Sequence, residues 1–257
     1  MQAVSISGPD AVAFVQSQLT LDIEASDAPA ARPAAWCGPD GRAALTLLAG
    51  RRDDSVTLIA PASLTGELLR LANRFRIGRR LEIGEPVAAA PAIPAGGIEP
   101  QAGRVALAFD PGRALQFGAE VEAQALAAAW LARDIECRMP WLAPETAGRF
   151  LPQTLGLAEL GGLSYAKGCY PGQEVIARVH YRGRVTRRLT RFRRDRAGEV
   201  PGPGTEFAVE TADGTVKGVV LYATAPAGTS VTGLAVVGAN APKQAAIRIG
   251  AGTGRLI

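Results

Sequence analysis

The stretch KGCYPGQEVIARVHYRGR, residues 167–184, places a cysteine between a lysine–glycine pair and a tyrosine, directly ahead of a helical pattern and a run of arginines. Gly168 and Gly172 can adopt positive φ angles and let other groups approach the backbone closely. Apolar residues recur at helical spacing after Pro171, so we expect a helix to begin there. The cysteine is therefore expected in a glycine-bearing loop just before a helix N-terminus.

Cys169 is in a setting that favours the thiolate. A thiol near a helix N-terminus, two residues from the ammonium group of Lys167, is expected to have a lowered pKa because both neighbours favour a negative charge. A thiolate is nucleophilic, so the residues allow a catalytic Cys169. They also allow a small buried thiol, which is the commoner role of a free cysteine.

The motif resembles the signature of a known family. KGCYPGQE, residues 167–174, matches K-G-C-Y-x-G-Q-E of the YgfZ family, folate-binding proteins related to the T-protein of glycine cleavage, at all seven fixed positions. Further segments that resemble the family are FVQSQLTLDI (14–23), LPQTLGL (151–157), ARVHYRGRVTRR (177–188), TVKGVVLYA (215–223) and GLAVVG (233–238). The likeness spans most of the chain.

The resemblance implies an α+β fold of the T-protein type, with ferredoxin-like αβ subdomains around a central cavity and a small C-terminal antiparallel β-barrel. It implies tetrahydrofolate, or a derivative, as the cofactor. It also implies an accessory protein that supports the assembly or repair of iron–sulfur enzymes, including one that methylthiolates tRNA. Folate and iron–sulfur client enzymes are the implied partners.

The site residues follow from the same motif. By position, the resemblance implies that Cys169 and Lys167 are catalytic. The implied cofactor-binding residues are Gly168, Tyr170, Gly172, Gln173, Glu174 and Arg178. We expect no metal site, because Cys37, Cys137 and Cys169 lack metal-ligand spacing and the chain has one histidine, His180.

One departure separates the chain from a true aminomethyltransferase. T-proteins carry an acidic residue near the early hairpin turn that assists folate chemistry. The counterpart here, GRAAL at 41–45, has no carboxylate, although Asp40 lies next to it. General acid/base help would be missing at that point. An aminomethyltransferase of one-carbon metabolism is therefore the first alternative, and not the leading hypothesis.

A second alternative comes from the arginines. Nine arginines and one acid, Asp195, lie within residues 178–196, a local excess of +8. Such density attracts polyanions, either the glutamate tail of folate or nucleic acid. A non-catalytic module that binds tRNA or a protein directly is thus possible, although for 191–196 we favour a solvated strand face. A ligand role is expected for one or two of Arg178, Arg182 and Arg184.

The rest of the sequence predicts two αβ units and a barrel. For the first unit, the expected elements are a helix after a Ser7–Asp10 capping box, a hairpin turning at Asp40–Gly41, strands at 55–60 and 79–83, and a helix over 64–75. For the second, they are strands at 104–109 and 114–118 around a turn at 110–112, and a helix over about 120–132.

The boundaries between these units follow from composition. Residues 86–100 carry four prolines and two glycines, which predicts a connector and not a strand or helix. Short apolar runs separated by turn residues after Thr190 predict the barrel. We therefore expect an N-terminal subdomain at 1–95, a second subdomain carrying the motif at 96–189, and the barrel at 190–257.

Composition excludes several classes of protein. Hydrophobic residues make up 47% of the 257 residues and charged residues 20%, which is typical of soluble globular chains. The longest apolar run, 125–132, is too short to span a bilayer, and the first ten residues lack the pattern of a signal peptide. We therefore expect a cytoplasmic protein without a membrane partner. The net charge of +4 rests on 25 arginines and three lysines.

Overall fold

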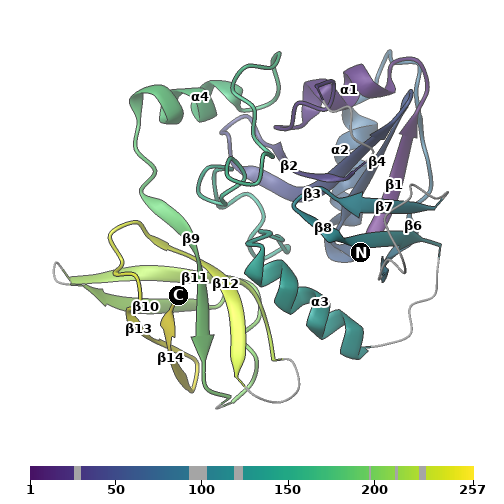
Figure 1. Cartoon of the computed structure of the whole chain (residues 1–257). Helices are drawn as coiled ribbons and strands as arrows, with labels where there is room; N and C mark the ends of the chain where they lie inside the picture. Colours follow the sequence, from purple (N-terminus) through teal and green to yellow (C-terminus); the bar gives the residue numbers. More distant parts are fainter. Residues whose placement is uncertain (26–29, 93–102, 119–123, 197, 212–213, 226–229) are drawn as a thin grey trace.

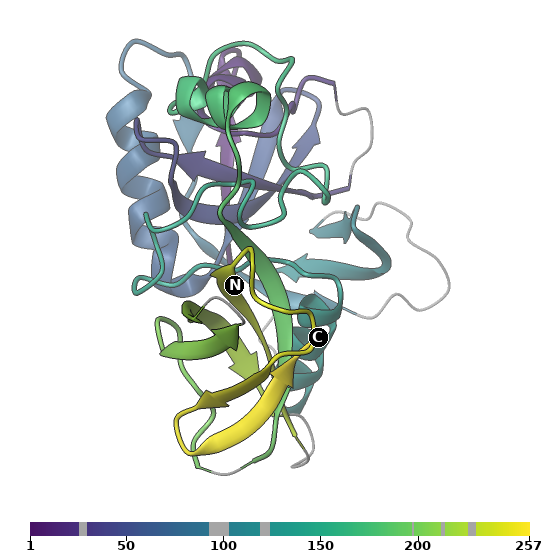
Figure 2. The same ribbon diagram turned by 90° about the vertical axis from the view of Figure 1, so that its left-hand side faces the viewer.

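The computed structural model describes residues 1–25, 30–92, 103–118, 124–196, 198–211, 214–225 and 230–257. A sheet with its helices forms one part of the molecule, and a β-barrel forms the other (Figure 1). Helix α3 (Gln124–Glu136) lies beside the barrel, and α4 (Gln173–Arg182) lies at the opposite end of the molecule, on the sheet part (Figures 1 and 2). Strand β9 (Arg187–Arg194) leads from α4 into the barrel.

The sheet has the strand order β2-β3-β4-β1-β6-β8-β7, with β5 paired to β1. Its strands are β1 (Gln2–Ser7), β2 (Arg32–Cys37), β3 (Ala43–Arg52), β4 (Ser55–Ala60), β5 (Glu82–Ile83), β6 (Val87–Ala92), β7 (Arg104–Leu107) and β8 (Asp110–Phe117). Ala31, just before β2, donates its N–H to Ala106 and accepts from Ala108 beside β7. The two edges of the sheet therefore approach each other.

Both faces of the sheet are covered. The middle of β3 is buried on successive residues, which indicates packing on both sides. Helices α1 (Ala11–Gln18), α2 (Thr65–Phe75) and the one-turn η1 (Ala62–Leu64) contribute apolar side chains such as Phe14 and Leu68. The segment from Met139 to Leu163, which has neither helix nor strand, adds Trp141 and Phe150 to the same core.

Several predicted elements are confirmed: the β2–β3 hairpin, β4 and α2. The capping box is wrong. Asp10 precedes α1 but makes no side-chain hydrogen bond to that helix. Its carboxylate instead accepts the backbone N–H of Arg80 at 2.7 Å, and the predicted strand at 79–83 shortens to the two residues of β5.

The predicted connector is also partly wrong. Strand β6 occupies its first half and pairs with β1 and β8, since Pro91 removes only one N–H from the ladder. Residues 93–100 lie outside the described part. The turn predicted at 110–112 falls at 108–109, because Asp110 already belongs to β8. Helix α3 runs to Glu136, past the predicted end at 132.

Ion pairs fasten α3 to β8. The Arg113 guanidinium lies 2.8 Å from the Asp110 carboxylate and 2.9 Å from that of Asp134, and Arg133 also reaches Asp110 at 2.8 Å. The Trp130 ring packs against Arg113, 4.4 Å from its guanidinium carbon. Removing Arg113 would leave two buried carboxylates poorly compensated, so this network sets the position of α3. The predicted domain boundary near residue 95 stays a prediction. It falls between β6 and β7, which belong to one sheet.

The predicted C-terminal barrel is present. It closes in the order β10-β11-β12-β9-β14-β13. Besides β9, its strands are β10 (Glu206–Thr211), β11 (Gly214–Thr224), β12 (Val231–Gly238), β13 (Ala246–Ile249) and β14 (Gly252–Leu256). Inside it, the Phe207 and Phe192 rings occupy the space that a Cβ would need at Gly218 and Gly233.

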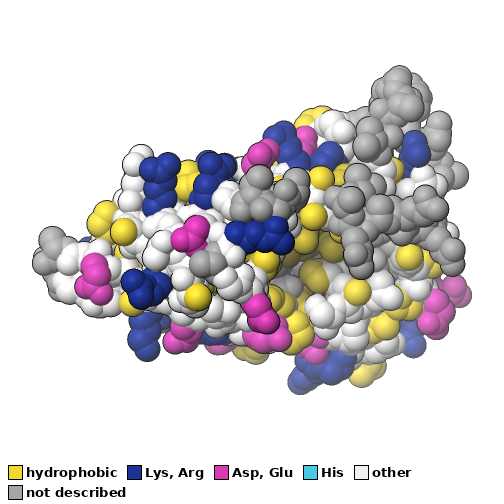
Figure 3. All heavy atoms as spheres, turned by 90° about the horizontal axis from the view of Figure 1, so that it is seen from below, with side chains coloured by type: hydrophobic (Ala, Val, Ile, Leu, Met, Phe, Trp, Pro, Cys, Tyr) yellow, Lys and Arg dark blue, Asp and Glu magenta, His cyan; other side chains and the backbone are white. Residues whose placement is uncertain are grey.

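The barrel is joined to the rest of the molecule by polar and apolar contacts. The buried Tyr222 hydroxyl donates to the Met139 carbonyl at 2.7 Å, and Arg149 pairs with Glu206 at 3.2 Å. Seen from below, the surface is hollowed between the barrel and the rest of the molecule, and hydrophobic side chains lie in the hollow (Figure 3). No helix in the described residues is long and apolar enough to cross a membrane.

Candidate functional site

The motif loop sits directly on the turn of the β2–β3 hairpin. Gly172, the residue before α4, has a φ of 78°. A Cβ on Gly172 would lie 2.5 Å from both the Gly38 carbonyl oxygen and the Gly41 Cα. Gly41 has a φ of 76°, and a Cβ there would meet Val175 at 3.1 Å. The two glycines therefore allow a backbone contact that no side chain would permit.

Helix α4 is fixed by two further contacts. Ile176 is fully buried, and its carbonyl accepts a hydrogen bond from the Gln153 amide at 2.8 Å. The helix therefore rests on the hairpin turn and on the 151–157 segment, the second of which resembles the family. Its N-terminal end and the loop before it take a defined position on the sheet part of the molecule.

Lys167 anchors the loop to the end of α1. The side chain is buried, and its ammonium group donates to three backbone carbonyls, two at the end of α1 and one just beyond it. The acceptors are Gln16, Leu19 at 2.7 Å and Leu21 at 2.7 Å. Burial lowers the pKa of Lys167 to about 8, against the opposing effect of Asp22 and Glu24. The ammonium group uses its three N–H donors in these hydrogen bonds, which cap the C-terminal end of α1. The catalytic role expected for Lys167 stays a prediction.

Tyr170 and Gln173 hold the loop internally. Tyr170 is 6% exposed, and its hydroxyl donates to the Ser164 carbonyl at 3.2 Å. Burial raises the pKa of this phenol above its usual range. The Gln173 amide donates to the Lys167 carbonyl at 3.3 Å. These contacts give both residues structural roles, and their cofactor-binding roles stay predictions.

The remaining motif residues face solvent. Cys169 is exposed, whereas Cys37 is buried and Cys137 half-buried, and all three are free thiols. Gly168 is exposed too. The loop thus presents its cysteine for contact with a partner, although the thiolate character and catalytic role expected for Cys169 stay predictions. Glu174 and Arg178 are also exposed, but the described residues contain no ion pair between them.

Next to the hairpin turn lies a pocket of about 320 Å³. Four arginines line it: Arg42, Arg149, Arg184 and Arg187. Arg42 pairs with Asp40 at 3.4 Å, so the carboxylate nearest to the T-protein acid position is turned toward a guanidinium. The sequence indicated Arg184 but not Arg42 or Arg149, because the pocket brings together three segments that are far apart in the chain.

The donors of this pocket fit one end of a folate. Guanidinium groups bind carboxylates in a bidentate manner, which suits the glutamate tail. The volume is at the lower end of the 300–1,000 Å³ range of ligand pockets, so it matches part of such a ligand and not the whole. The fit therefore concerns the anionic tail.

His180 of α4 belongs to an aromatic cluster that also includes Tyr165 of the preceding segment. Its ring stacks on Tyr165 with centroids 3.8 Å apart, and Tyr181 meets it edge-on at 4.7 Å. Tyr181 is 69% exposed. The imidazole ring therefore packs against two tyrosine rings. The same helix also carries the exposed Arg178 and Arg182.

The glycine contact makes a first prediction. We expect Gly172→Ala to lower the free energy of unfolding more than the matched control Gly148→Ala does. The control should cost about 1–2 kcal/mol, the strain of a left-handed alanine alone, since nothing lies within 4 Å of its Cβ position. Gly172→Ala adds overlap with the hairpin backbone, which raises the cost by about 1–3 kcal/mol. Urea unfolding measures both, and equal losses for the two variants would contradict the contact.

Lys167 makes a second prediction. Lys167→Met leaves three buried carbonyls without their donor, so we expect a loss of at least about 3 kcal/mol in the free energy of unfolding. The matched control Lys217→Met removes an exposed lysine of the barrel and should stay within about 0.5 kcal/mol of the unchanged protein. Wild-type stability in Lys167→Met would refute the anchoring role.

Comparison with known proteins supports this description. No protein-family model matches the chain. A crystal structure of the glycine cleavage system aminomethyltransferase T from Bartonella henselae matches with a TM-score of 0.70, covering 99% of this chain and 81% of that one. At 14% sequence identity, this likeness confirms the T-protein type of fold and no more.

A curated relative shows similarity in sequence as well. The tRNA-modifying protein YgfZ of Edwardsiella ictaluri (strain 93-146) is 28% identical over 281 residues, which cover 96% of this chain and 85% of that protein. The resemblance to the YgfZ family, first indicated by the KGCYPGQE motif, is thereby confirmed along nearly the whole chain.

Proposed function

We propose that the chain is a tetrahydrofolate-binding accessory protein that supports the assembly or repair of iron–sulfur enzymes, including one that methylthiolates tRNA. The similarity to a protein named for tRNA modification supports this proposal. The observation that carries it is the contact of Gly172 with the hairpin turn, which brings the exposed Cys169 loop to the turn that also contributes Arg42 to the arginine-lined pocket.

In this proposal, one set of residues binds the folate and another presents the Cys169 thiol. Arg42, Arg149, Arg184 and Arg187 would hold the carboxylates of the folate tail. Bound tetrahydrofolate would supply a carrier of one-carbon groups. Cys169 is accessible enough to meet a client protein, while Lys167 and Tyr170 keep its loop in one conformation through their buried contacts. A cytoplasmic location is part of the same proposal.

The two alternatives differ in support. An aminomethyltransferase would need a free acid near the hairpin turn, and Asp40 instead pairs with Arg42 and accepts its backbone N–H at 3.2 Å. A module that binds RNA directly has one favourable observation, the exposed Tyr181 ring on a helix that also carries the exposed Arg178 and Arg182. An unpaired base can stack on such a ring while arginines meet the backbone.

Thermal unfolding with tetrahydrofolate tests the proposal. A ligand that binds only the folded state adds about 2.7 kcal/mol of stability at a hundredfold excess over its dissociation constant. We expect this gain in the unchanged protein and a smaller gain in Arg184→Gln/Arg187→Gln. The control Arg52→Gln/Arg76→Gln removes two exposed arginines outside the pocket and should behave like the unchanged protein.

Two outcomes would count against folate binding at this pocket. One is no stabilisation of the unchanged protein at saturating tetrahydrofolate. The other is an equal loss of stabilisation in both double variants, which would mean that the effect follows net charge and not position.

A further inference from the structure

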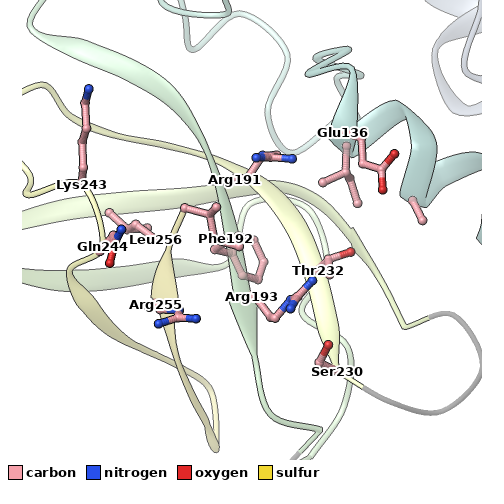
Figure 4. Close-up of a pocket in the computed structure, with 13 residues that line it drawn as sticks. Glu136, Arg191, Phe192, Arg193, Ser230, Thr232, Lys243, Gln244, Arg255 and Leu256 are labelled. Carbon is pink, nitrogen blue, oxygen red and sulfur yellow. The ribbon is translucent and has the colours of Figure 1, made fainter.

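A larger pocket lies on the outer face of the barrel beside α3. Its volume is about 730 Å³, within the range of small-molecule sites. It extends across β9 from α3 to the loop before β13 (Figure 4). Four cationic side chains line it: Arg191 and Arg193 of β9, Arg255 of β14, and Lys243. None of these residues belongs to the KGCYPGQE motif or to the pocket at the hairpin turn.

Strand register places two of the cations side by side. Arg193 lies directly opposite Arg255 on β14 and opposite Thr232 on β12. The next residues, Phe192 and Leu256, point into the barrel, so Arg193, Arg255 and Thr232 share its outer face. Like charges directly opposite each other destabilise an antiparallel pair. An anion bound between them would remove that repulsion.

Two acids lie near these cations: Glu136 lines the same pocket, and Asp195 lines the adjoining one. The described residues nevertheless contain no ion pair with Arg193 or Arg255, and Glu136 is paired with Arg133 at 2.9 Å. Arg191 points toward α3 (Figure 4), and its Nε atom is buried without a hydrogen-bond partner. A buried donor without an acceptor is costly, which a bound acceptor would offset.

The chemistry of the lining identifies the kind of anion. The Arg193 side chain points toward Ser230 and Thr232 (Figure 4), so guanidinium and hydroxyl donors meet at one end of the pocket. A smaller adjoining pocket of about 330 Å³ shares Arg193, Ser230 and Arg255 with it. Ala132 of α3 and the exposed Ile257 add apolar surface to the lining. Phosphate oxygens accept from such donors, and a sugar or base can rest on the apolar part.

We propose that this pocket binds a phosphate ester of a nucleotide, either free or within an RNA strand. The opposed Arg193 and Arg255 hold the phosphate together with the hydroxyl of Ser230. The site is independent of the folate proposal, because it lies on the barrel and shares no lining residue with the pocket at the hairpin turn.

Fluorescence anisotropy at low ionic strength tests the proposal with two probes. One is fluorescently labelled adenosine 5′-monophosphate, and the other is a labelled oligouridylate of about ten nucleotides. Arg193→Gln/Arg255→Gln should weaken binding of the recognised probe by at least about tenfold, since charge-assisted hydrogen bonds are lost. The control Arg76→Gln/Arg248→Gln removes two exposed arginines outside the pocket and should change it by less than about twofold.

The probes also separate the two sources of the phosphate. If Arg193→Gln/Arg255→Gln weakens binding of the mononucleotide and the control does not, the ligand is a free nucleotide. If only binding of the oligonucleotide responds in this way, the ligand is RNA. Thermal unfolding in inorganic phosphate gives a second readout: the melting temperature should rise with phosphate in the unchanged protein and in the control, and should rise less in Arg193→Gln/Arg255→Gln. Absence of binding of both probes, or equal weakening in the two double variants, would overturn the proposal.

Discussion

The site depends on one backbone contact, that of Gly172 with the Gly38–Gly41 turn of the β2–β3 hairpin. The distances leave no room for a Cβ at Gly172, and its φ of 78° is one that other residues rarely adopt. Because α4 begins at the next residue, this contact sets where the helix starts and where the preceding loop lies. A glycine in the motif and a glycine in a distant hairpin therefore act as one structural unit.

Most of the motif serves to hold this loop, and few of its residues remain free for chemistry. Lys167 closes the end of α1, Tyr170 is buried under Lys167 with the ammonium 5.3 Å from the ring centroid, and Gln173 binds the loop backbone. Cys169 stays exposed in the middle. Most of the seven fixed positions of the signature therefore define the conformation of this eight-residue loop. In that conformation the loop presents a single thiol.

The sequence predicted local elements well and long-range contacts poorly. Turn residues and periodicity located the β2–β3 hairpin, α2 and the short strands of the barrel, since these depend on neighbouring residues. Composition failed at β6, where one proline costs a single ladder bond, and the capping spacing failed at Asp10, whose carboxylate binds Arg80 across the fold. For the site, the motif gave the loop and its cysteine. The acceptors of Lys167 and the arginine pair Arg193–Arg255 depend on the tertiary fold and on strand register, which no local pattern reports.

The most direct measurement is the activity of an iron–sulfur enzyme that methylthiolates tRNA, in a strain that lacks this protein and carries single-cysteine variants of it. If the loop exists to present the exposed thiol, Cys169→Ala fails to restore activity, whereas Cys137→Ala, which removes a half-buried thiol outside the motif, restores it as the unchanged protein does. Full restoration by Cys169→Ala would contradict a working role for this sulfur atom.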